Sequence, residues 1–98
     1  MKILFFHASY CGSCPATQLA AILYAEQIHA KFQAYHVQDV YGGHETAKKL
    51  HVKHVPCTIL LDDSGKELTR IEGGRTLEEM QELFKNFINL FKELNICE

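Results

Sequence analysis

Residues 10–15 read Tyr-Cys-Gly-Ser-Cys-Pro, and they lie between an apolar run at residues 3–6 and a helix-like stretch at residues 16–31. This order places Cys11 and Cys14 in a strand-to-helix turn. The first turn of a helix has unpaired backbone N–H groups and the positive end of the helix dipole, and both favour a thiolate over a thiol. We therefore expect Cys11 to be a nucleophile and Cys14, one turn further along, to form a disulfide with it.

The Cys-x-x-Cys spacing alone has a second interpretation, because zinc sites use the same spacing. His54 and Cys57 flank Pro56 and would complete a tetrahedral set of ligands. Successive residues of a strand face opposite sides, however, so Cys57 faces away from the cysteine pair if Pro56 faces toward it. We predict no metal site, and a metal-binding module remains an alternative.

Length and composition predict one ordinary globular domain. The 98 residues suffice for a single core over residues 1–98, and the hydrophobic and charged fractions of 47% and 22% are typical of globular proteins. The net charge of -2 and the lack of a long basic cluster argue against nucleic acid or an anionic membrane as partner. The first apolar run is too short for a signal peptide, so we expect a cytoplasmic protein.

The apolar pattern and the turns predict alternating strands and helices. The predicted order is strand, helix, strand, helix, strand, strand, helix, at residues 2–7, 16–31, 32–40, 45–50, 58–61, 66–72 and from 76 onward. In the first helix the spacing predicts that Leu19, Ile22, Leu23 and Ile28 face the core. Thr76 and Glu79 have the form of a capping box at the start of the last helix.

The chain resembles the thioredoxin superfamily, and the resemblance covers most of its length. Three features carry it: the order strand, Cys-Gly-Ser-Cys, helix; the pair Val55-Pro56 before a later apolar strand; and the Gly-Gly pair at 73–74 before the last helix. The resemblance implies an α/β fold, a minimal thioredoxin fold with a four-stranded mixed sheet and helices on both faces. Like glutaredoxins, the chain lacks the extra N-terminal strand and helix of many thioredoxins.

The resemblance also implies a mechanism. Cys11 would attack a protein disulfide and form a mixed disulfide, and Cys14 would release the reduced partner, with Gly12 and Ser13 forming the turn between them. Pro56 matches the cis-proline of the superfamily.

A substrate surface follows from the same resemblance. Val55 and Gly73 would line it beside Pro56, and Tyr10 stands where thioredoxins have a tryptophan. For two of these residues an alternative is open: Pro56 as a trans proline that opens a strand, and Tyr10 as a half-buried aromatic.

Two departures from the thioredoxin pattern bear on the chemistry. Phe5 occupies the position of a buried aspartate, so a proton acceptor for Cys14 is missing. Ser13 replaces the proline between the cysteines, and in the family this change alters the redox potential.

The sequence therefore predicts a thiol-disulfide oxidoreductase that reduces or exchanges protein disulfides. We expect a monomer without a cofactor that takes electrons from a reductase or a low-molecular-weight thiol. The alternatives are a glutathione-linked, glutaredoxin-like activity and a non-catalytic binding module. Of the other cysteines, we expect Cys57 to be buried and Cys97, near the end of the last helix, to be exposed.

Overall fold

The computed structural model describes the backbone of residues 1–96, with side chains as far as Lys85 and that of Phe87. Its elements follow the predicted order. They are β1 (Lys2–His7), α1 (Cys14–Gln27), β2 (Lys31–His36), α2 (Gly43–Lys49), β3 (Cys57–Leu61), β4 (Glu67–Glu72) and α3 (Leu77–Ile96). The expectation for Cys97 lies outside the described residues.

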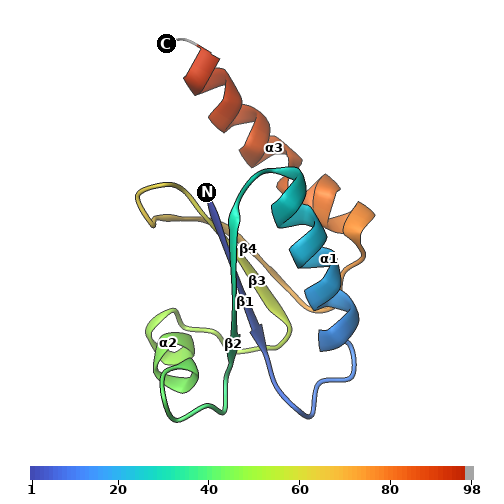
Figure 1. Ribbon diagram of the computed structural model, residues 1–98, viewed down its shortest axis with the longest axis vertical. Coiled ribbons are helices and arrows are strands. Elements are labelled where there is room, and N and C mark those ends of the chain that lie inside the picture. Colours follow the sequence, from blue (N-terminus) through green and yellow to red (C-terminus); the bar gives the residue numbers. More distant parts are fainter. Residues whose placement is uncertain (97–98) are drawn as a thin grey trace.

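The four strands form one mixed sheet in the order β2-β1-β3-β4 (Figure 1). Strand β1 pairs in parallel with β2 and antiparallel with β3, and β3 pairs antiparallel with β4. Only β3 therefore runs against the other strands, which confirms the predicted sheet. All four residues at positions 3–6 of β1 are buried, because helices cover both faces of this interior strand.

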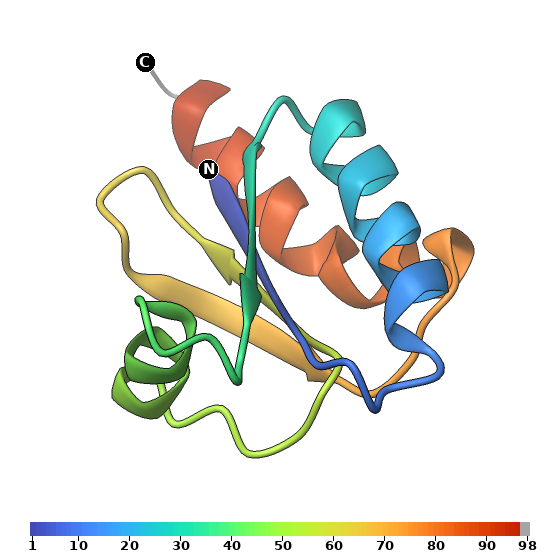
Figure 2. The same cartoon turned by 60° about the horizontal axis from the view of Figure 1, so that its bottom comes forward.

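Each face of the sheet has its own apolar core. Helices α1 and α3 cover one face, where Phe5 packs with Tyr24 and Phe84. Helix α2 lies on the other face, where Phe6 packs with Ala47 (Figure 2). The predicted helices on both faces are thus confirmed, and the core alternates along β1.

The predicted core face of α1 is wrong at Leu19 and Leu23, whereas Ile22 is half-buried and Ile28, just after the helix, packs against the core. Leu19 and Leu23 are 58% and 40% exposed, whereas Ala20, Ala21 and Tyr24 are buried. Small side chains let the helix lie close to the sheet and to α3, and the single large Tyr24 fills the remaining space against Phe84, with ring centroids 5.6 Å apart. The pattern of large apolar residues therefore predicted a buried stripe next to the one that is buried in the structure.

Helix α2 is short and lightly packed. Of its residues only Gly43 and Ala47 are buried, and its N-cap residue Gly42 provides no side-chain hydrogen bond. Gly43 lies so close to β2 that a Cβ atom there would overlap the carbonyl oxygen of His36. The two glycines at the start of α2 thus allow the helix to lie against the sheet.

Helix α3 begins with the predicted capping box. The Thr76 N–H donates to Glu79 Oε1 at 3.0 Å, and the Glu79 N–H donates to Thr76 Oγ1 at 3.1 Å. This reciprocal pair satisfies two N–H groups that the helix start leaves free. No helix in the described part of the chain is both long and apolar enough to span a membrane.

Candidate active site

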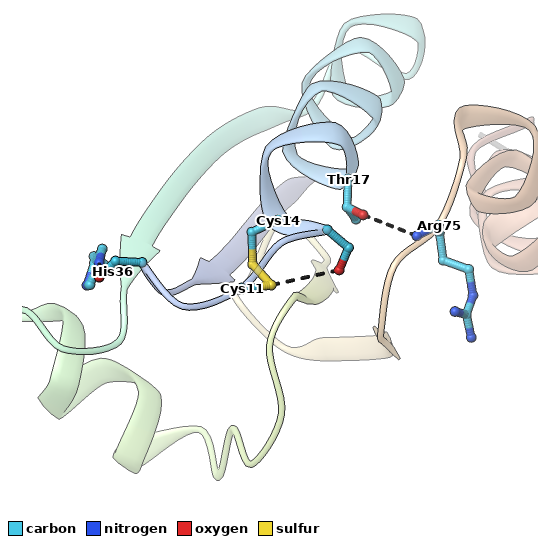
Figure 3. The surroundings of a disulfide bond; sticks show 7 residues. Cys11, Cys14, Thr17, His36 and Arg75 are labelled. Carbon is cyan, nitrogen blue, oxygen red and sulfur yellow. Dashed lines mark hydrogen bonds between the residues drawn. A yellow bond between two sulfur atoms is a disulfide. The ribbon is translucent and has the colours of Figure 1, made fainter.

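Cys11 and Cys14 are joined by a disulfide at the start of α1 (Figure 3). Their Cα atoms are 5.4 Å apart. Cys11 lies in the loop after β1 and is partly exposed, whereas Cys14 is the first residue of the helix and only 3% exposed. Cys11 is therefore the member of the pair that is open to a partner molecule.

The turn between the cysteines is built by local backbone hydrogen bonds. The Cys11 N–H donates to the carbonyl of Ala8 at 3.2 Å, and the Cys14 N–H donates to the carbonyl of Cys11 at 3.3 Å. Pro15 lies in the first turn of α1, where its missing N–H has no consequence, and that turn contains no acidic residue. The positive end of the helix dipole is thus not neutralised beside Cys11.

The two turn residues differ in their surroundings. Ser13 Oγ lies 3.8 Å from Cys11 Sγ, within hydrogen-bonding range of sulfur. Gly12 is exposed, and a Cβ atom there would contact nothing within 4 Å. The hydroxyl of Ser13 is therefore the side-chain group of the turn that can stabilise charge on Cys11.

Pro56 and Gly73 lie together at the same end of the sheet as this turn. The Val55–Pro56 peptide bond is cis in this structure, and the carbonyl of Pro56 accepts a hydrogen bond of 2.8 Å from the Gly73 N–H. Pro56 is buried and Val55 half-buried. Tyr10 is 73% exposed, so it is not a half-buried aromatic.

Two residues that the sequence analysis missed fix the loop before α3. The buried Thr17 hydroxyl accepts a hydrogen bond of 3.2 Å from the Arg75 N–H (Figure 3). A Cβ atom on Gly74 would lie 3.2 Å from Cβ of Ser13. The loop is thereby held against the first turn of α1. One sign of this contact was present in the sequence, a threonine three residues after Cys14.

A second group missed from the sequence lies where β1 and β2 end. The rings of His7 and His36 meet edge to face with centroids 5.1 Å apart. Burial, and then the neighbouring His36, lower the pKa of His7. His36 Nδ1 accepts a hydrogen bond of 3.2 Å from the Gln38 N–H, and the Ser9 hydroxyl lies 3.4 Å from His36 Nε2. The pair therefore ties the loop after β1 to the loop after β2.

Phe5 lies in the core between the sheet and α1 and is fully buried. Phe5 pairs with Thr58 on the neighbouring strand β3. The hydroxyl of Thr58 has no hydrogen-bond partner among the described residues. Because the two side chains lie on the same face, a buried polar group stands next to the apolar ring. Position 5 therefore carries an apolar ring and no carboxylate.

The residues considered for zinc do not come together. Cys57 is 1% exposed in the core under α2, and burial raises its pKa to about 11. His54 is exposed, and its Nε2 lies 3.9 Å from Oε2 of Glu72. Over the described residues, no three His, Cys, Asp or Glu side chains are grouped in a way that could hold a metal ion.

Comparison with known proteins places these features in a family. Residues 1–88 match the thioredoxin-like domain family. A thioredoxin 1 from the thermophilic eubacterium Thermosipho africanus has a similar structure at 23% identity, with 94% of this chain and 99% of that chain covered and a TM-score of 0.75. A mutant thioredoxin from Halobacterium salinarum is similar at 24% identity over 88% of this chain and 73% of that one, with a TM-score of 0.69.

A third structure extends the comparison to a eukaryote. The oxidised thioredoxin from Plasmodium falciparum is 17% identical, with 88% and 79% of the two chains covered and a TM-score of 0.70. At these identities the solved structures show the shared fold alone. No curated protein sequence matches the chain.

Proposed function

Because the chain belongs to the thioredoxin-like domain family, we propose that it is a thiol-disulfide oxidoreductase that reduces or exchanges protein disulfides through Cys11 and Cys14. The observation that carries the proposal is the asymmetry of the bonded pair: Cys11 is partly exposed, whereas Cys14 is buried. A nucleophile must meet its substrate, whereas a resolving thiol needs to reach only the nucleophile.

In the first step, the Cys11 thiolate attacks one sulfur of a substrate disulfide. A bond forms between Cys11 Sγ and that sulfur, and the second substrate sulfur leaves as a thiolate. The unneutralised N-terminus of α1 and the Ser13 hydroxyl, 3.8 Å from Cys11 Sγ, support the attacking thiolate. Tyr10, Val55 and Gly73 would border the surface on which the substrate backbone lies, and the buried Pro56 would support it from below.

In the second step, the Cys14 thiol loses its proton and attacks Cys11 Sγ. The Cys11–Cys14 disulfide forms, and the bound substrate leaves as a thiolate that takes up a proton. The substrate gains two electrons and the pair loses two. A reductase or a low-molecular-weight thiol would then reduce the pair again, in the reducing environment of the cytoplasm.

A two-variant experiment tests this assignment. The purified protein should accelerate dithiothreitol-driven reduction of a model protein disulfide. Cys11→Ser should abolish the activity, because it removes the accessible sulfur. Cys14→Ser should retain the attack but trap the substrate as a mixed disulfide on Cys11, detectable by non-reducing mass spectrometry.

The opposite pattern would overturn the roles. An active Cys11→Ser protein, together with a Cys14→Ser protein that accumulates no adduct, would show that Cys11 is not the nucleophile. Cys57→Ser is the matched control: it also removes one thiol, but a buried one in the core under α2, and it should leave the exchange intact.

A further inference from the structure

Two hollows are lined by residues close to Cys11 in the sequence. One includes Ser13 and is lined by residues of α1, of the loop before α3 and of the first turn of α3. The other, which we term the α2 groove, measures about 390 Å³ and is lined by Tyr10, Val37, Gln38, His44, Ala47, Lys48 and Val52. Because Tyr10 immediately precedes Cys11, the loop that carries Cys11 also contributes a wall of the α2 groove.

The two hollows differ in charge. The hollow on the Ser13 side has both a cation, Arg75, and a carboxylate, Glu79, on its wall. The α2 groove has Lys48 and His44, which carry positive charge when ionised, and no carboxylate among the described residues lines it. The chain as a whole has a net charge of -2, so the charge on this wall is opposite in sign to the net charge.

The remaining walls of the α2 groove suit a short aliphatic stem. Val37, Ala47 and Val52 are apolar, while Gln38 and Tyr10 have a polar amide and a polar hydroxyl. A glutamate or aspartate side chain has this construction, with methylene groups that end in a carboxylate. An arginine or lysine side chain would instead bring a cation toward Lys48.

We propose that the α2 groove binds an acidic side chain of the protein substrate, close in sequence to the cysteine that Cys11 attacks, and so selects substrates. The proposal rests on the proposed thiol-disulfide exchange. Opposite charges would lower the energy of the encounter with an acidic substrate, and like charges would raise it for a basic one. The groove thus determines which disulfides react fastest and not whether the exchange occurs.

The test measures attack by Cys11 on short peptides. Each peptide contains one cysteine activated as a mixed disulfide with 2-nitro-5-thiobenzoate, and Glu or Lys stands at one of the two positions on either side of it. Attack by the reduced protein forms the bond between peptide and Cys11 and releases the coloured thiolate. Its appearance under single-turnover conditions gives the rate for each peptide.

For wild-type protein at low salt, the best-placed Glu peptide should react roughly two- to fivefold faster than its Lys counterpart, the range expected for a partly exposed ion pair. Lys48→Glu should bring this ratio below one. The preference should also shrink at high ionic strength, because salt screens the interaction.

Lys49→Glu is the matched control. Lys49 is the next residue, lies like Lys48 in the last turn of α2, and changes the net charge equally, but it does not line the groove. Lys49→Glu should therefore keep most of the wild-type ratio.

Two outcomes would overturn the inference: equal rates for Glu and Lys peptides at all positions, or an equal loss of preference in Lys48→Glu and Lys49→Glu. Both leave the exchange itself measurable. A wild-type protein that releases no thiolate from any peptide would instead contradict the proposed function.

Discussion

Phe5 is the residue at which this chain departs most from the chemistry of thioredoxins. The resolving step needs Cys14 to lose a proton, and the apolar ring of Phe5 offers no acceptor for it. The Thr58 hydroxyl, which has no hydrogen-bond partner among the described residues, lies opposite Phe5 on β3 and could donate to a carboxylate at position 5. An aspartate at position 5 would therefore find one hydrogen-bond donor already in place.

We predict that Phe5→Asp speeds decay of the mixed disulfide near pH 7 and flattens the pH dependence of that decay. Phe5→Leu is the matched control, because it also shortens the side chain but adds no carboxylate. Phe5→Leu should cost less than the about 3–5 kcal/mol of a Phe-to-Ala change in a core, whereas Phe5→Asp should cost more than Phe5→Leu because it also buries a carboxylate. Stopped-flow measurement of substrate release tests the pair, and decay no faster in Phe5→Asp than in Phe5→Leu would contradict the role of the missing acid.

Cys57 shows how burial controls thiol reactivity. Because burial raises its pKa to about 11, only about one Cys57 in a thousand is a thiolate at pH 8. In a variant with the other three cysteines replaced by serine, iodoacetamide should label Cys57 slowly in native protein and much faster in urea. The native labelling rate should rise as the pH approaches 11. Fast native labelling at pH 8 would show that Cys57 is accessible.

At the scale of elements, Gly43 sets how closely α2 approaches the sheet. A methyl group there would overlap the His36 carbonyl, so Gly43→Ala should lower the free energy of unfolding by about 3 kcal/mol. Gly12→Ala is the control, since its Cβ atom would have open space; its effect should stay within about 0.5 kcal/mol. Urea denaturation compares the two. Equal losses would mean that α2 shifts to accommodate the methyl group.

An ion pair on β4 also connects two elements. The Arg70 guanidinium donates two hydrogen bonds, of 2.7 and 2.6 Å, to the Glu67 carboxylate. It also donates one of 2.8 Å to the carbonyl of Leu50, the residue that follows α2. The hydrogen bond from Arg70 lowers the pKa of Glu67. The stabilisation is therefore complete above the unfolded-state pKa of about 4.3 and is lost as the pH falls through the lower folded-state pKa.

We predict that Glu67→Gln costs about 0.5–1 kcal/mol of unfolding free energy at pH 7, as expected for a partly exposed pair. The difference in unfolding free energy between variant and wild type should shrink below pH 4, because wild-type Glu67 then becomes protonated and, like glutamine, carries no charge. Thermal unfolding monitored by circular dichroism from pH 7 to pH 3 measures it. A difference that stays constant over this range would show that the pair does not contribute through its charge.

The elements themselves could be predicted from local signals. The apolar run of β1, the turn at residues 62–65 and the capping box of α3 each have a local physical cause, and each is where the sequence predicted it. The buried stripe of α1 could not be predicted, because Ala20 and Ala21 are buried by the closeness of their neighbours and not by their own size. The same holds for Thr17 and Arg75, whose contact joins residues 58 positions apart.

At the scale of the whole molecule, the site is a meeting of loops from one end of the sheet. The sequence predicted the cysteine pair and Pro56, since each has its own local motif. The α2 groove has none: its walls come from three separate segments, and Lys48 reads in the sequence as an ordinary surface lysine. Only the topology brings Lys48 near Tyr10.

The light packing of α2 has a consequence for hydrogen exchange. Strand β1 is bonded on both sides, so its amides should exchange with deuterium only when the whole domain opens. Helix α2, with two buried residues and no side-chain N-cap, should open on its own and exchange orders of magnitude sooner. The wall that carries Lys48 would then open far more readily than the central strand that leads into the cysteine turn. A substrate that orders this wall would slow deuterium uptake there while uptake in β1 stays unchanged.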